Sequence, residues 1–209
     1  MPSTLVHVAV GGIVGAALLG AAFDRRSIAV VLAAAAVPDL DTFTGIYLLG
    51  THRALLHTFV VPAVLGGVLL YDGRIRPRSV LRARWGDRGV RVAGVAVLSL
   101  LFGGILPDLM TNGVNVLYPL HDQFYTVDGK VLLSNQRGVV QTFVELSPPE
   151  KPTQPSTTAN THYWTGVDVA RGEEPEHVER IFPVVRSGFQ LLVVLLGALT
   201  VGGRLLEGE

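Results

Sequence analysis

The sequence contains no cysteine and comparatively little charge. Because none of its 209 residues is cysteine, the chain cannot form a disulfide scaffold, a thiol nucleophile or a thiolate metal site. Charged residues make up 16% of the chain, well below the roughly 25% found in soluble domains. Basic and acidic residues number 17 each. The resulting zero net charge argues against a nucleic-acid partner bound through bulk positive charge.

The sequence is instead rich in apolar runs that contain glycine. Hydrophobic residues account for 49% of the chain, which has 24 glycines, and the mean hydropathy is +0.44. Glycine inside apolar runs suits helices that pack closely in lipid. We therefore predict a mainly α, multi-pass membrane protein with four to five membrane helices, forming a single domain over residues 1–209.

Five apolar stretches approach the ~20 residues, or ~17 at the short end, that a spanning helix needs. They are residues 5–23, 27–37, 54–70, 92–107 and 188–203. The second stretch is too short to span alone and is closed by Pro38. It therefore extends across residues 24–27, tilts, or packs as a half-buried helix. A soluble protein with buried helices is the alternative to a membrane protein.

The distribution of arginine predicts the orientation in the cell membrane. Residues 71–91 hold seven arginines against two aspartates, so we expect this loop to be cytoplasmic. Alternation of the helices then makes residues 109–180 an extracytoplasmic insertion. Within it, β-branched runs at residues 129–133 and 139–144 predict a small hairpin. The Pro/Ser/Thr-rich stretch at residues 147–160 predicts an extended linker.

This topology brings ionisable side chains from four helix ends to the outer membrane face. They are His7, Asp39, Asp41, His52, His57 and Asp108. Ionisable groups at membrane depth are costly and usually face a cavity or one another. Imidazole and carboxylate together suit zinc, manganese or iron. Each residue also has a simpler interpretation, since the aspartates that follow prolines can cap helices and the histidines can mark the membrane boundary.

The spacing of His52 and His57 does not place both side chains on one face of a helix. Residues five apart diverge by about 140° on an ideal helix. We therefore expect His52 in a loop or at a helix start and His57 one turn into the helix. Arg53 between them has two open roles, since it can pair with a phosphate or extend its side chain to the interface.

Four motifs in order along residues 5–145 carry a family resemblance. An early histidine in an apolar helix is followed by Pro-Asp-Leu-Asp, by Thr-His-Arg-x3-His-Thr and by Asp-Leu-x-Thr-x-Gly-Val-x-x-Leu-Tyr-Pro. This combination resembles the YdjM-like family of predicted inner-membrane metal-dependent hydrolases. The resemblance implies a distant similarity to the all-helical zinc phospholipase C fold. It also implies a ligand set with three polar neighbours, namely His7, Asp39, His57 and Asp108 with Asp41, His52 and Arg53 nearby.

One position departs from the family pattern. The family usually shows His-x3-Asp at the fourth helix, whereas here Gly104 precedes Asp108 by four residues. The missing imidazole leaves three possibilities. His121 or another group compensates, the site holds fewer metal ions, or the protein has lost its activity.

The leading hypothesis is a membrane-bound metal-dependent hydrolase acting on a phosphoester or lipid-like substrate at the outer membrane face. The predicted metal ligands are His7, Asp39, His52, His57 and Asp108. Zinc is the expected ion, with manganese and iron as alternatives. Asp41 or Asp39 would take a proton from water, and Arg53 would hold the phosphate. The bilayer is the expected partner, and no nucleic-acid or protein partner is indicated.

Two other functions fit the sequence. One is a non-catalytic metal-binding or scaffold membrane protein that has kept the fold and lost turnover, which the glycine at position 104 favours. The other is a transporter, in which aspartate and histidine form an ion path. The polar residues lie at helix ends, and no paired broken helices are evident, which argues against transport.

Overall fold

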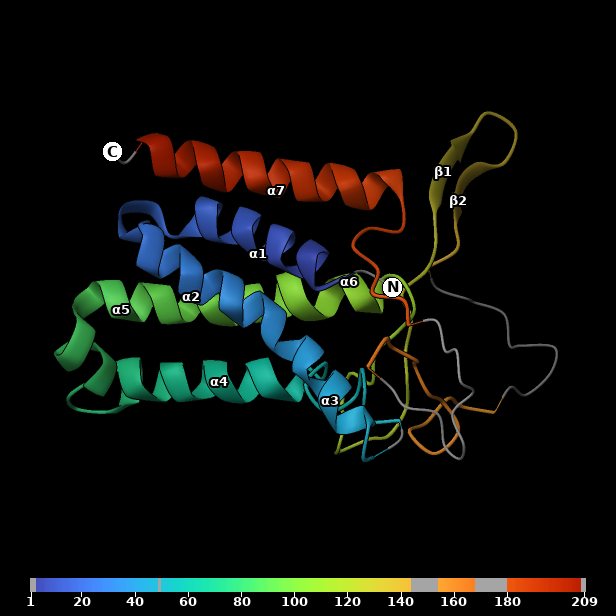
Figure 1. Ribbon diagram of the computed structural model, residues 1–209, viewed down its shortest axis with the longest axis horizontal. Helices are drawn as coiled ribbons and strands as arrows, with labels where there is room; N and C mark the ends of the chain where they lie inside the picture. Colours follow the sequence, from blue (N-terminus) through green and yellow to red (C-terminus); the bar gives the residue numbers. More distant parts are fainter. Residues whose placement is uncertain (1–2, 49, 144–153, 168–179, 208–209) are drawn as a thin grey trace.

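The protein is mainly helical, as predicted. The computed structural model describes residues 3–48, 50–143, 154–167 and 180–207, and helices make up 58% of them. The longer helices lie side by side in Figure 1, with the N-terminus at the end from which the loops and the hairpin extend. They are α1 (Thr4–Leu18), α2 (Arg25–Ala36), α4 (Val60–Leu70), α5 (Val80–Ser99) and α7 (Gly188–Glu207). A short 3₁₀ helix, η1 (Gly20–Ala22), joins α1 to α2.

The second helix does not end before Pro38. The 3₁₀ turn η2 (Val37–Leu40) and α3 (Asp41–Gly45) continue it, giving a helical segment of 21 residues over Arg25–Gly45. Pro38 lies in the first turn of η2, a position where a missing N–H is tolerated. The predicted stretch is therefore extended at both ends, back to Arg25 with Asp24 as the N-cap and forward past the proline. It carries Asp39 and Asp41 inside a helical segment.

The fourth predicted segment also continues further than its apolar run. The π-helical η4 (Leu100–Ile105) and α6 (Leu106–Leu109) follow α5 directly, giving 30 residues over Val80–Leu109. The arginine-rich residues 71–91 are consequently not a simple loop. They begin with the π-helical η3 (Tyr71–Ile75) and end within α5, which bends at Gly86 with a φ of 65°.

Among the described residues, three helical segments are long and apolar enough to cross a membrane. They are Arg25–Gly45, Val80–Leu109 and Gly188–Glu207. The first predicted span forms α1, of 15 residues, and the third forms α4, of 11 residues. The expected number of four to five spans is therefore not confirmed, although the class of helical membrane protein is.

The insertion after α6 contains the predicted hairpin. Strands β1 (Val131–Ser134) and β2 (Gly138–Gln141) pair antiparallel, with Leu132 opposite Val140. Residue 144 of the second predicted strand and residues 147–153 of the predicted linker lie outside the described residues. So do residues 168–179 of the insertion.

Glycines allow the helices to approach closely near the end that carries the loops. A Cβ at Gly11 of α1 would lie 2.6 Å from Ala35 Cβ of α2. A Cβ at Gly104 of η4 would lie 2.6 Å from Pro38 Cγ and 2.8 Å from the Ala35 carbonyl oxygen. The glycine-rich apolar runs therefore serve close helix packing, as expected for helices in lipid.

Replacement of Gly104 should destabilise the protein because the contacted atoms include backbone and a rigid proline ring. We expect Gly104→Leu to cost about 1–3 kcal/mol, as overpacking usually does. The matched control is Gly94→Leu on the same continuous helix, because a Cβ there meets nothing within 4 Å. Thermal unfolding in detergent micelles measures both. Equal midpoints for the two variants would contradict the packing described here.

Candidate metal centre

Two imidazoles and two carboxylates meet where four chain segments converge. His7 comes from α1, Asp39 from η2, His57 from the turn before α4, and Asp108 from α6. One ligand atom of each lies within 4.8 Å of the others. The side chain of Asp39 is 21% exposed, whereas the other three are buried. The structure thus brings together four of the five predicted metal ligands.

The distances between these ligand atoms suit a single ion. Asp39 Oδ1 lies 3.7 Å from His7 Nε2 and 3.6 Å from His57 Nε2. Asp108 Oδ2 lies 3.6 Å from His7 Nε2 and 2.9 Å from His57 Nε2. Tetrahedral coordination with bonds of about 2.1 Å separates neighbouring ligand atoms by about 3.4 Å. The cluster is therefore close to the size of a tetrahedral metal site.

Hydrogen bonds on the far side of each ring fix which nitrogen faces the cluster. His7 Nδ1 lies 2.8 Å from the Gly103 carbonyl oxygen, which can only accept, so Nδ1 is the donor. His57 Nδ1 donates to Asp41 Oδ2 over 2.9 Å. Both Nε2 atoms are buried and have no partner in hydrogen-bonding geometry. A neutral ring then directs its Nε2 lone pair into the cluster, as histidine ligands of metals usually do.

Asp41 lies behind the cluster and orients both neighbouring histidines. It is fully buried, and its Oδ1 accepts a hydrogen bond from His52 Nδ1 over 2.7 Å. Its Oδ2 accepts from His57 Nδ1 and from the amides of Arg53, at 3.1 Å, and Leu56, at 3.3 Å. The spacing of the histidines predicted His57 one turn into a helix. This prediction is wrong, because His57 lies in an irregular turn before Val60, where α4 begins.

His52, the fifth predicted ligand, stands beside the group of four. Its ring centroid is 5.8 Å from that of His57, and its Nδ1 is engaged by Asp41. Its Nε2 is buried without a hydrogen-bond partner. The same side chain lines the cavity next to Asp39, so His52 faces this cavity.

Arg53 is wholly buried and holds Asp108 in place. Its Nη2 forms an ion pair with Asp108 Oδ1, and its Nη1 donates to the Gly113 carbonyl oxygen over 3.1 Å. The guanidinium also lies 4.8 Å from the Tyr163 ring centroid. Because the side chain is buried, it does not extend to the membrane interface, and it is not among the residues that line the cavity.

The backbone at Arg53 is strained. Its φ of 64° lies in the left-handed region, which costs a residue other than glycine about 1–3 kcal/mol. The Arg53 amide donates to Asp41, and its carbonyl accepts from the Asn115 amide over 2.9 Å. The surrounding hydrogen bonds therefore hold the strained conformation that turns the guanidinium toward Asp108.

Further polar contacts connect the insertion after α6 to the turn that carries Arg53. Asp122 accepts hydrogen bonds from Asn115 Nδ2, at 2.7 Å, and from the amide and hydroxyl of Thr158, at 3.0 and 2.7 Å. Burial raises the pKa of Asp122, but the bonds from Thr158 and Asn115 outweigh it and lower the pKa below its ordinary value. Burial also raises the pKa of Tyr163, against the opposing effect of Arg53.

The imidazole that the resemblance led us to expect at position 104 has no substitute among the described residues of this cluster. His121 is exposed and lies 3.2 Å from Gln123 Oε1 and 3.2 Å from the Tyr125 hydroxyl. Gly104 itself packs against Pro38 and the Ala35 carbonyl, which leaves no space for a side chain. In the described residues, the group is therefore complete with two imidazoles and two carboxylates.

The charges of the group are compatible with a bound cation. Asp39, Asp41 and Asp108 carry three negative charges, and Arg53 carries one positive charge. With neutral histidines, the set has a net charge of −2, which is expensive to bury unless it is compensated. A divalent cation would balance this charge, and the donor set suits such an ion.

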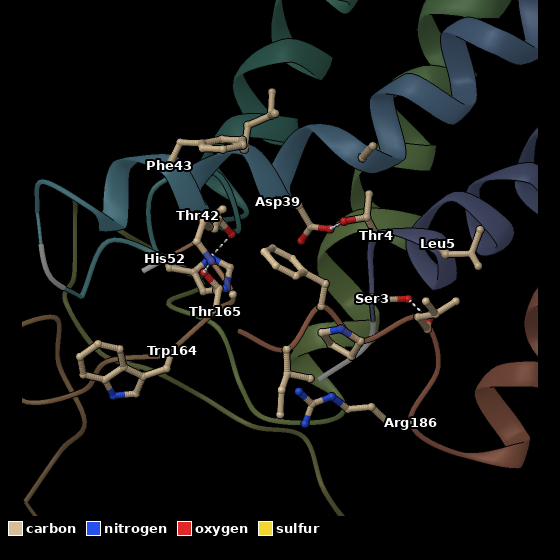
Figure 2. A pocket seen from close by; sticks show the side chains of 18 residues that line it. Ser3, Thr4, Leu5, Asp39, Thr42, Phe43, His52, Trp164, Thr165 and Arg186 are labelled. Carbon is tan, nitrogen blue, oxygen red and sulfur yellow. Dashed lines mark hydrogen bonds between the residues drawn. The ribbon is translucent and has the colours of Figure 1, made fainter. Parts of the chain in front are cut away.

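A cavity of about 870 Å³ opens beside the cluster. Of the four ligands, Asp39 is the one that lines it. In Figure 2, Asp39 and His52 stand on one side of the cavity and Arg186 on the other. The hydroxyl of Thr4 donates a hydrogen bond to Asp39 Oδ2. This leaves Oδ1 as the carboxylate oxygen nearest to the two histidines.

Sequence reasoning missed three groups at this site. Thr4 stands one helical turn before His7, a spacing that indicates a shared face. Arg186 is a basic residue just before α7, on the side where the arginine pattern predicted few basic residues, and this departure was a usable signal. The Gly103 carbonyl could not have been found, because its exposure depends on the π-helical geometry of η4.

Comparison with known proteins identifies the family. The YdjM inner membrane protein family matches residues 1–170, a range that includes all four clustered ligands. The chain belongs to this family. No curated protein and no solved structure matches the chain, and the expected similarity to zinc phospholipase C is not shown.

The purified protein should bind one divalent metal ion per chain. We expect Asp39→Ala to weaken zinc binding at least tenfold, since loss of a ligand removes both a donor atom and a negative charge. The control is His121→Ala, which removes an imidazole outside the cluster. Metal analysis after dialysis, followed by competition with a chelator, measures both. Wild-type binding by Asp39→Ala would exclude this carboxylate as a ligand.

Proposed function

We propose that this YdjM family member is a membrane-bound, metal-dependent hydrolase of a phosphoester substrate. The observation that carries the proposal is the position of Asp39. Its Oδ1 faces the two histidines, and its side chain also lines the cavity of about 870 Å³. The cluster is thus open to a ligand-sized space on one side, whereas buried side chains enclose the other three residues.

His7, Asp39, His57 and Asp108 would hold the ion. Zinc suits two imidazoles and two carboxylates, and manganese and iron suit them as well. A divalent ion there would polarise a phosphoryl oxygen and lower the pKa of a nearby water molecule towards about 7.

The side chains of the site have two kinds of role, proton transfer and positioning. Asp39 accepts the proton of the attacking water as the new P–O bond forms, and returns it to the leaving alcohol oxygen as the ester bond breaks. Thr4 orients Asp39 through Oδ2. Asp41 and Arg53 are positioning residues, because Asp41 fixes the His57 ring and Arg53 fixes Asp108.

A second candidate function is non-catalytic metal binding. Four protein ligands can fill a tetrahedral shell, which is typical of structural zinc sites, whereas catalytic zinc sites usually keep one position open. The cluster of four ligand atoms within 4.8 Å favours this alternative. Under it, the ion would stabilise the convergence of the segments and no substrate would react.

Hydrolysis of a short soluble phosphoester, p-nitrophenyl phosphate, separates the two candidates. We expect metal-dependent turnover that a chelator abolishes and zinc or manganese restores. At a metal concentration that saturates the variant, Asp39→Asn should lower turnover by about 10²–10⁴-fold, the usual contribution of a general base. Asp128→Asn, at an exposed position in the insertion, is the control. Protein that binds metal but shows no turnover would favour the structural site.

We also propose that residues 71–91 are cytoplasmic and that residues 109–180 face the other side. The absence of cysteine allows single cysteines to be introduced at positions 80 and 155, both of which are exposed. In sealed right-side-out vesicles, a membrane-impermeant reagent should label position 155 and spare position 80, because arginine-rich segments stay in the cytoplasm. The opposite labelling pattern would reverse the proposed orientation.

A further inference from the structure

The walls of the cavity beside Asp39 are largely apolar. Leu40 and Phe43 line it from η2 and α3, and Ile181, Phe182 and Val184 line it from the segment before α7. Leu40, Phe43 and Phe182 are 53%, 55% and 64% exposed. Large apolar side chains left open around one cavity are typical of a surface that binds an apolar ligand.

The polar groups of the cavity are concentrated at a few points. Asp39 connects it to the ligand cluster, and His52 presents a buried Nε2 that has no hydrogen-bond partner. Arg186 contributes the only guanidinium among the described lining residues, and Figure 2 shows it across the cavity from Asp39. Within the described part of the chain, that guanidinium has no ion pair. An unpaired arginine facing a metal-ligand cluster suits a phosphate, which it can hold through two parallel hydrogen bonds.

We propose that this cavity binds a phosphate-bearing lipid, with its hydrocarbon chain against Leu40, Phe43 and Phe182 and its phosphate between Arg186 and the ligand cluster. The inference rests on the proposed function, since the bound phosphate is the group to be hydrolysed. The volume of about 870 Å³ lies within the roughly 300–1,000 Å³ usual for ligand pockets. A free phosphate ion would leave the apolar walls without a partner, and a simple hydrocarbon would leave Arg186 without one.

The position of the cavity in the bundle supports a ligand that comes from the bilayer. It lies where α1 and α7 begin and where the segment Arg25–Gly45 approaches its end. Exposed apolar residues of these helices, such as Leu5 and Leu191, would face lipid, so an amphiphile could enter with its chain still in contact with hydrocarbon. Residues 181–186 lie beyond the part of the chain that the family matches. This wall is therefore the place where the present chain can set its own substrate preference.

Trp164 offers a direct report of occupancy. The chain has two tryptophans. Trp164 lines the cavity, whereas Trp85 lies in the first half of α5 and is not among the residues that line it. In a Trp85→Phe background, a brominated long-chain alkyl phosphate should quench Trp164 fluorescence saturably, without any need for turnover. A Trp164→Phe background, which retains Trp85, reports non-specific partitioning of the probe and should show no saturable quenching.

Two pairs of variants test the two ends of the ligand. Ala36→Phe fills the cavity, and its control Ala33→Phe adds the same ring at an exposed position of α2 that does not line the cavity. Arg186→Gln removes the charge, and its control Arg137→Gln lies in the turn of the β-hairpin. We expect Ala36→Phe and Arg186→Gln each to weaken quenching by the alkyl phosphate roughly tenfold, and both controls to bind normally.

Two further probes separate the possible sources of the phosphate. The brominated alcohol of the same chain length should bind roughly tenfold more weakly than the phosphate, since it cannot pair with Arg186. Inorganic phosphate should displace the probe only weakly, because it makes no apolar contact. Equal competition by inorganic phosphate would overturn the lipid assignment in favour of a soluble phosphate ligand.

Quenching of Trp164 tests the lipid site, and turnover of p-nitrophenyl phosphate tests the hydrolase, so the two proposals can fail independently. Equal quenching in wild type, Ala36→Phe and Arg186→Gln would overturn the lipid site, whatever the turnover of p-nitrophenyl phosphate. Selective loss of quenching in these two variants supports the lipid site. If that loss occurs in protein that shows no metal-dependent turnover, the cavity assignment stands and the hydrolase assignment falls.

Discussion

The buried carboxylate of Asp41 controls the geometry of the turn that carries two histidines and an arginine. A buried carboxylate is expensive unless several donors satisfy it, and here the donors are two imidazoles and two backbone amides. These bonds orient the His57 ring and hold the strained backbone of Arg53. Arg53 in turn fixes Asp108. One carboxylate thus determines the placement of two of the four clustered ligands, although it is not one of them.

The close packing of the helices provides the other half of the site. The glycines at positions 11 and 104 bring α1, α2 and η4 within backbone contact. The π-helical turn in η4 presents the Gly103 carbonyl to His7. A side chain at any of these contacts would separate the segments from which His7, Asp39 and Asp108 project. Because a Cβ at Gly104 would meet Pro38 and the Ala35 carbonyl, position 104 has no space for an imidazole.

The convergence of the helix ends could be predicted from the sequence alone. The apolar segments and the arginine distribution together indicate which helix ends share a membrane face, and neither pattern depends on tertiary contacts. The course of the chain through Pro38 was not predictable from the apolar run alone, since a 3₁₀ turn accepts proline in its first turn. The roles of Asp41 and Arg53 were also beyond reach. Their motif places them near the ligands, but only tertiary contacts show that one orients His57 and the other holds Asp108. Arg186 was missed because it belongs to no motif, although a basic residue on that side departs from the charge pattern.

The order of the ligands along the chain has a consequence for biosynthesis. All four lie between positions 7 and 108, so a nascent chain carries the full ligand set before the insertion and α7 have been made. The cavity wall at residues 181–186 arrives much later. A metal ion captured early would join the first helices while they enter the membrane. The substrate space would then close only when the last helix is in place, so the growing protein would hold its ion before it can hold a lipid.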